Sequence, residues 1–185
     1  LDWNKADWPK AILHFSRALG FANTGNPSAA KKELDILVSL RDRLTSAKNS
    51  YESGQVTIQI EAIKAWIEYS KGNSEEAIAY MKVASNLESK TSKAAVTPGE
   101  IIPADELLAD LYLALNKPKE ALETYKINLN GHPSRFNGIY GAAKAAQNLN
   151  DIEQATYYFE ELIRLSVKTN STRPEVSEAK DFLAI

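Results

Sequence analysis

The stretch that decides the fold is NKPKEALETYKINLNGHPSRFNGIYGAAKAAQNLNDIEQA, residues 116–155. It contains two short turns, 116–121 and 150–155, and each runs from an asparagine through polar residues to an alanine. Another alanine stands twelve residues before each closing alanine, and an aromatic residue stands four residues after it. The alanines are Ala109, Ala121, Ala143 and Ala155, and the aromatic residues are Tyr125 and Phe159. This spacing predicts two helical hairpins.

The same pattern occurs twice in the first half of the chain, around the turns 25–30 and 72–77. Here the turns open with glycine, the alanines are Ala18, Ala30, Ala65 and Ala77, and the bulky residues are Leu34 and Met81. Small residues where two helices cross let their backbones approach, and a large residue one turn later fills the space. Glycine or asparagine suits a left-handed helix stop. Pro27, Ser74 and Asp151 suit the first turn or the cap of the next helix.

Apolar residues at helical spacing extend outward from these turns. They predict hairpins over 9–48, 55–90, 103–130 and 134–168, and a capping helix over 174–184. Residues 49–54 are expected to form a turn and 89–103 a longer loop, in which Ile101 and Ile102 pack against the body. No strand is predicted. We therefore expect 1–185 to be one all-α domain, with the last helix covering an otherwise open apolar face.

The alanine pattern resembles the tetratricopeptide repeat from about Trp8 to Leu165. Pro133 stands where that family's repeat-ending proline belongs, and Ala121 to Ala155 is its 34-residue period. The resemblance implies a right-handed α-solenoid of about four hairpins, whose first helices line a concave face. Two features depart from the family. The intervals from Ala30 to Ala77 and from Ala77 to Ala121 are 47 and 44 residues, and the family's tryptophan position holds His14, Glu61, Asp105 and Ile139.

The segments HFSRALGFANTGN (14–26) and RPEVSEAKDFLA (173–184) are similar to the C-terminal part of larger bacterial tetratricopeptide proteins of unassigned function. That resemblance implies that further helix pairs precede Leu1. Trp3 and Trp8 lie next to this end of the chain. We expect them to pack against such upstream repeats or against a second copy of the chain, as in a homo-oligomer.

Composition and motifs exclude several functions. The 22 basic and 24 acidic residues give a net charge of −2, which does not fit a dedicated nucleic-acid binder. The absence of cysteine excludes disulfides, thiolate zinc sites and a cysteine nucleophile. No apolar run reaches the roughly 18 residues of a membrane span. Nucleophile-elbow and HExxH motifs are missing, and Gly138 and Gly141 favour close helix packing over phosphate binding. We therefore expect no catalytic residues, no metal and no cofactor.

The function that the resemblance implies is binding of a peptide or protein partner on the concave face. Aromatic anchors beside amides and a few charges are typical of such contacts. An alternative is that the aromatic residues in the first two hairpins only pack against neighbouring helices. The family's carboxylate clamp is not reproduced, because Lys144 is the only basic residue at the groove positions. The candidate contact residues are Phe15, Trp66, Tyr69, Asp110, Tyr140 and Lys144.

A second hypothesis comes from one repeat position. His14, Glu61 and Asp105 occupy it in three successive hairpins and offer ligand types that a divalent metal accepts. They would form a metal- or small-molecule-binding site, or support a larger metal-dependent enzyme. Helix axes lie about 8–10 Å apart, so these side chains converge only in a tightly curved stack. Otherwise each is solvated or hydrogen-bonded separately.

Overall fold

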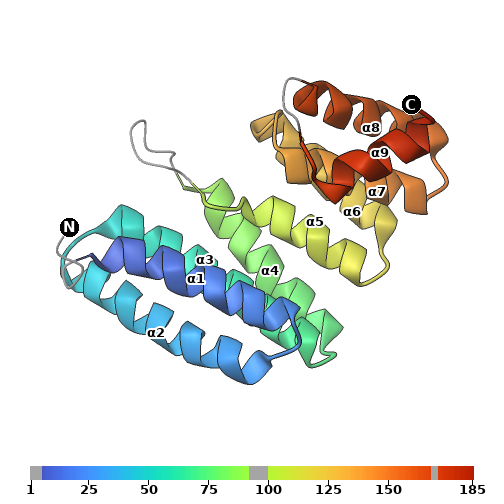
Figure 1. Ribbon diagram of the computed structural model, residues 1–185. Coiled ribbons are helices and arrows are strands. Elements are labelled where there is room, and N and C mark those ends of the chain that lie inside the picture. The colour runs from blue at the N-terminus through green and yellow to red at the C-terminus, as the bar shows by residue number, and fades with distance from the viewer. Residues whose placement is uncertain (1–5, 92–99, 168–170) are drawn as a thin grey trace. The chain divides into compact units, whose positions relative to one another are not determined.

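The computed structural model describes residues 6–91, 100–167 and 171–185, and within these ranges it contains nine α-helices and no strand (Figure 1). The predicted all-α fold is therefore confirmed. None of the described helices is long and apolar enough to cross a membrane. The helices are α1 (Asp7–Asn23), α2 (Pro27–Ser46), α3 (Ser50–Ser70), α4 (Ser74–Ser89), α5 (Ala104–Ala114), α6 (Pro118–Gly131), α7 (Phe136–Asn148), α8 (Ile152–Ser166) and α9 (Pro174–Leu183).

The chain forms two compact units, Leu1–Leu107 and Leu108–Ile185. In the first unit α1 packs on α2, α2 on α3 and α3 on α4, and α1 also lies against α3 (Figure 1). In the second unit α6 packs on α7, α7 on α8 and α8 on α9. Sequential packing of this kind is typical of helical repeats. The organisation of residues 1–185 as one domain stays a prediction.

The alanine pattern identifies the helix crossings correctly. All eight repeat alanines are fully buried, with 0% of each residue exposed. The bulky residues that follow them are also buried, and Tyr125 and Phe159 expose 1% or less. A methyl group at each crossing therefore permits close backbone approach, and the large side chain fills the adjoining space.

The turns follow the local chemistry that the sequence predicts. The residue that opens each predicted repeat turn has a positive φ: 74° at Gly25, 87° at Gly72, 54° at Asn116 and 56° at Asn150. Pro27 begins α2, where the Asn26 side chain accepts a hydrogen bond from the Ala29 amide at 3.1 Å. Asp151 caps α8 in the same way, accepting from the Gln154 amide at 3.1 Å. These caps satisfy amides that have no partner inside the helix.

The predicted turn over 49–54 is wrong, and the second hairpin begins at Ser50 instead of residue 55. Asn49 precedes α3, and its Nδ2 donates to Glu52 Oε2 at 3.2 Å in the first turn. Gly54 lies inside the helix. A single glycine lowers helix stability by only about 1 kcal/mol, and the packing of α3 on α2 and α4 outweighs that cost.

Gly141 permits the closest packing between α6 and α7. A Cβ atom there would lie 2.2 Å from Cζ of Tyr125 and 2.3 Å from its Oη. Tyr125 has little room to withdraw, because it is 1% exposed and its hydroxyl donates to the Asp110 carboxylate. The prediction that this glycine serves helix packing is confirmed.

Candidate functional site

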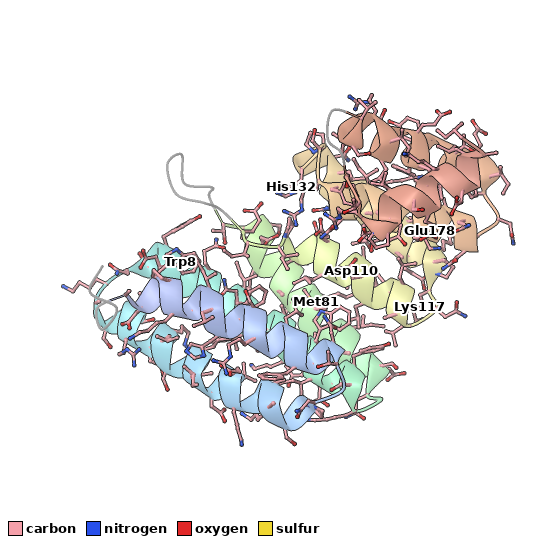
Figure 2. The ribbon with its side chains drawn as sticks, viewed as in Figure 1. Trp8, Met81, Asp110, Lys117, His132 and Glu178 are labelled. Carbon is pink, nitrogen blue, oxygen red and sulfur yellow. The ribbon has the colours of Figure 1, made fainter. Side chains whose placement is uncertain are left out.

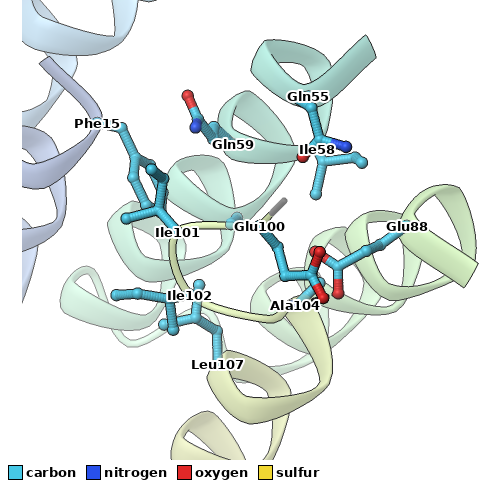
Figure 3. Close-up of a pocket in the computed structure, with 11 residues that line it drawn as sticks. Phe15, Gln55, Ile58, Gln59, Glu88, Glu100, Ile101, Ile102, Ala104 and Leu107 are labelled. Carbon is cyan, nitrogen blue, oxygen red and sulfur yellow. Dashed lines mark hydrogen bonds between the residues drawn. The ribbon is translucent and has the colours of Figure 1, made fainter. Parts of the chain in front are cut away.

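The first helices of the first two hairpins, α1 and α3, form a groove in the first unit. We call it the α1–α3 groove. Its lining is mixed, with apolar side chains and two glutamine amides, and α4 and the start of α5 contribute one edge (Figure 3). The lining residues on the helices are Phe15, Gln55, Ile58, Gln59, Ala62, Glu88, Ala104 and Leu107, and Glu100, Ile101 and Ile102 complete the lining.

The segment Glu100–Pro103 lies in this groove as a non-helical stretch. Figure 3 shows the Ile101 side chain beside Phe15 and the Ile102 side chain beside Leu107. The prediction that these isoleucines pack against the body is confirmed. The cavity that remains measures about 10 Å³, which has room for one water molecule at most. The groove is thus filled by the chain's own residues.

The downstream end of this segment is fixed to α4 by two hydrogen bonds. The Ala104 amide donates to Glu88 Oε2 at 2.8 Å, which supplies an acceptor to the first turn of α5. Ser85 Oγ donates to Asp105 Oδ1 at 2.5 Å. Ile101 and Ile102 themselves are only half-buried.

Gln55 and Gln59 expose 5% and 7% of their surface, so the groove buries two amides. Gln59 Oε1 accepts no hydrogen bond from any residue that the structure describes. About two turns further along α3, Trp66 Nε1 is likewise buried without an acceptor in the described part of the chain. A buried polar atom without a hydrogen-bond partner lowers stability by about 1–3 kcal/mol. A ligand that supplies a donor to Gln59 Oε1 or an acceptor to Trp66 Nε1 would recover part of this free energy.

Of the predicted contact residues in the first unit, Phe15 and Trp66 are buried, and Tyr69 is half-buried. Phe15 lies in the α1–α3 groove. Trp66 and Tyr69 form an edge-to-face pair with ring centroids 5.5 Å apart. Tyr69 is the member of this set that presents the most surface to solvent.

The predicted contact residues on α7 are held by the last helix. Glu178, labelled on α9 in Figure 2, accepts hydrogen bonds from Tyr140 Oη at 2.6 Å and from Lys144 Nζ at 2.5 Å. Burial and then the Glu178 carboxylate raise the pKa of Tyr140 well above its usual value. Burial raises the pKa of Glu178, but the hydrogen bonds from Lys144 and Tyr140 outweigh it, so that pKa is lowered. The capping helix therefore engages this polar cluster.

Asp110 on α5 accepts a hydrogen bond from the buried Tyr125 hydroxyl of α6. Its carboxylate thus has a structural partner within the second unit. An open hollow of about 370 Å³ lies elsewhere in that unit, between α6 and α8, and sequence reasoning missed it. Its rim includes Lys126, Tyr157 and Glu161.

The structure does not bring His14, Glu61 and Asp105 together on one ion. His14 Nδ1 lies 2.5 Å from Glu33 Oε2, Lys64 Nζ pairs with Glu61 at 2.7 Å, and Asp105 accepts from Ser85. No group of three or more potential ligands that could hold a metal occurs among the described residues. The three side chains project from separate helices, and each finds a partner on its own helix or the adjacent one. The metal-site alternative is therefore not favoured.

Two polar residues that organise the fold gave weak sequence signals. Glu33 is a buried carboxylate on α2, placed between His14 and Arg17, whose Nη2 lies 2.8 Å from Glu33 Oε1. Its position on the apolar stripe with Ala30, Leu34 and Leu37 could have indicated burial. Glu178 lies on a short polar helix, and no spacing in the sequence links it to α7. Trp3 lies outside the described residues, and Trp8 is half-buried.

Comparison with known proteins adds one finding. No family model matches the chain, and no curated protein does. A solved structure described as "Crystal structure of MamA protein" is similar, with a TM-score of 0.51, 12% identity, and coverage of 89% of this chain and 97% of that one. At this identity the likeness shows the fold alone. Together with the nine described helices, it supports an all-α, tetratricopeptide-like helical repeat fold.

Proposed function

We propose that this chain is a non-catalytic interaction module that binds a peptide or protein partner on the surface formed by the first helices of its hairpins. The observation that carries the proposal is the α1–α3 groove, where the non-helical segment Glu100–Pro103 packs against apolar side chains and buried amides. A surface that packs against non-helical polypeptide offers chemistry that peptide recognition needs. The helical repeat fold supports this function.

The proposed contact surface includes Phe15, Trp66 and Tyr69 in the first unit. In the second unit it includes Asp110, Tyr140 and Lys144, where engagement of a partner competes with the contacts of Tyr125 and Glu178. Aromatic side chains beside amides supply most of the binding energy in such interfaces, and the surrounding charges give specificity. We place the main anchor at Tyr69, because it is accessible and next to Trp66.

The test is selection of random displayed peptides on the purified chain, followed by affinity measurement with two matched variants. Tyr69→Ala removes the proposed anchor on α3, and Tyr157→Ala removes a 57% exposed tyrosine on α8 at the other hollow. We expect the selected peptides to bind the Tyr69 variant at least fivefold more weakly and the Tyr157 variant unchanged. Loss of binding only in the Tyr157 variant, or no selected binder at all, would contradict the proposal.

A further inference from the structure

The segment Glu100–Pro103 occupies the α1–α3 groove as a ligand would. Two adjacent branched side chains, Ile101 and Ile102, line this site together with side chains of α1, α3, α4 and α5, and the cavity between them measures about 10 Å³ (Figure 3). Pro103 is buried and ends the non-helical stretch immediately before α5. The chain's own segment thus indicates which side chains the groove accepts, namely two adjacent branched aliphatic ones.

The fit of this segment is incomplete in its polar contacts. Gln59 Oε1 is buried in the groove and receives no hydrogen bond from the described residues, although polar atoms in such positions normally have a partner. A peptide that brings an N–H group to this oxygen would gain a contact that the chain's own segment does not make. The groove therefore has binding capacity beyond its present occupant.

Release of the segment from the groove does not require a hairpin to open. Two hydrogen bonds to α4, from Ala104 to Glu88 and from Ser85 to Asp105, hold the start of α5 just downstream of the segment. Ile101 and Ile102 keep part of their surface in solvent, so release exposes less new apolar area than release of fully buried residues would. The helices α1 to α4 retain their direct packing on one another.

We propose that the α1–α3 groove is a docking site for a partner peptide with two adjacent branched aliphatic side chains, and that Glu100–Pro103 blocks it in cis. This inference rests on the proposed function, and names the partner chemistry and the regulation of that surface. A tethered segment competes at a high effective concentration. The apparent affinity for a partner therefore falls in proportion to the fraction of molecules in which the groove is open.

The test uses a fluorescent peptide with the sequence EIIPADEL, that of residues 100–107, and fluorescence anisotropy. In the full chain, Ile101→Ser with Ile102→Ser empties the groove. The matched control is Ile127→Ser, an isoleucine on α6 that is 61% exposed. We expect the double variant to bind the peptide at least tenfold more tightly than the wild type, and the control to behave as the wild type. A peptide with serine in place of both isoleucines should not bind.

The proposal is overturned if the folded double variant binds the peptide no better than the wild type. If circular dichroism shows that the double variant does not fold, Ile101→Cys provides a second test, because the chain has no other cysteine. The EIIPADEL peptide should then accelerate labelling of the introduced thiol by a maleimide at least fivefold and saturably. A labelling rate that does not respond to the peptide overturns the proposal.

Failure of this inference is distinguishable from failure of the proposed function. The selected peptides could require Tyr69 and still bind the wild type and the Ile101/Ile102 double variant equally well. That result would support the interaction surface and would contradict the proposal that Glu100–Pro103 blocks it. If neither the wild type nor the double variant binds any peptide, in the selection or in the anisotropy experiment, both the proposed function and the cis block are contradicted.

Discussion

Gly141→Ala should destabilise the second unit, although the same change stabilises most helices. The new Cβ would lie 2.2 Å from Tyr125 Cζ and 2.6 Å from Cε1, far inside contact distance. The Tyr125 ring is buried, so relief requires a shift that strains the core and breaks the hydrogen bond to Asp110. The local helix itself would gain from alanine, which makes the sign of the effect diagnostic.

The magnitude follows from three contributions. Alanine in place of glycine gains about 1 kcal/mol of helix propensity. Overpacking costs about 1–3 kcal/mol, and loss of a hydrogen bond to a charged acceptor costs about 1.5–3 kcal/mol. We therefore expect the free energy of unfolding to fall by about 1.5–5 kcal/mol. With a urea dependence of about 2 kcal/mol per molar, the midpoint falls by about 0.8–2.5 M.

The assay is urea unfolding followed by circular dichroism and by tryptophan fluorescence. All three tryptophans, Trp3, Trp8 and Trp66, precede Leu108, so fluorescence reports on the first unit and circular dichroism on both. Gly20→Ala is the control, because nothing lies within 4 Å of a Cβ there, and it should stabilise by about 0.5–1 kcal/mol. In a Tyr125→Leu background the Gly141→Ala penalty should largely disappear. A neutral or stabilising effect of Gly141→Ala in the wild type would refute the reasoning.

Three further predictions concern charged groups. Glu178→Gln should lower stability at pH 7 by about 0.5–1 kcal/mol, a small value because the carboxylate is partly exposed. The pKa of Glu178 is lower in the folded chain than in the unfolded chain, where it is about 4.3. The stability from this carboxylate is therefore fully present above pH 4.3 and is lost as the pH falls through the folded-state pKa. Urea unfolding of both proteins at pH 7 and pH 3 checks it, and an equal difference at both pH values would count against it. Glu33→Ala should lower the free energy of unfolding by about 1–3 kcal/mol, because it leaves His14 without its partner on α2. Glu33→Gln keeps a hydrogen-bond acceptor and should lower it less. Equal melting temperatures for the two variants would disprove this. Asp151→Ala should lower the chemical unfolding midpoint through loss of the α8 cap, and Asp151→Asn should restore most of that loss. An alanine variant with an unchanged midpoint would exclude the capping role.

The parts of the fold that depend on local chemistry were predictable from the sequence. The eight repeat alanines, the four positive-φ turn residues and the caps at Asn26 and Asp151 are set by sterics and hydrogen bonding over a few residues. The predicted turn over 49–54 is wrong because α3 begins at Ser50 and continues through Gly54. Tertiary packing of α3 overrides the low helix propensity of that glycine.

The site was less predictable because it depends on which segments dock against which. The sequence predicted Phe15 as a contact residue on the concave face, but it did not place Ile101 beside Phe15, since a loop's path is decided by tertiary contacts. Tyr140 and Lys144 were predicted as partner contacts, and the structure shows Glu178 between them. Likewise, equivalence of repeat position placed His14 and Glu61 in one row, whereas His14 contacts Glu33 and Glu61 pairs with Lys64.

The central claim is that the α1–α3 groove binds apolar peptide. Its most direct measurement is a nuclear magnetic resonance titration of the Ile101→Ser, Ile102→Ser variant with the EIIPADEL peptide, observing the side-chain amides of Gln55 and Gln59. Saturable shifts of both amides, with Gln147 on α7 unmoved, are the predicted result. Peptide binding that leaves Gln55 and Gln59 unchanged, or no binding by the folded variant, would contradict the claim.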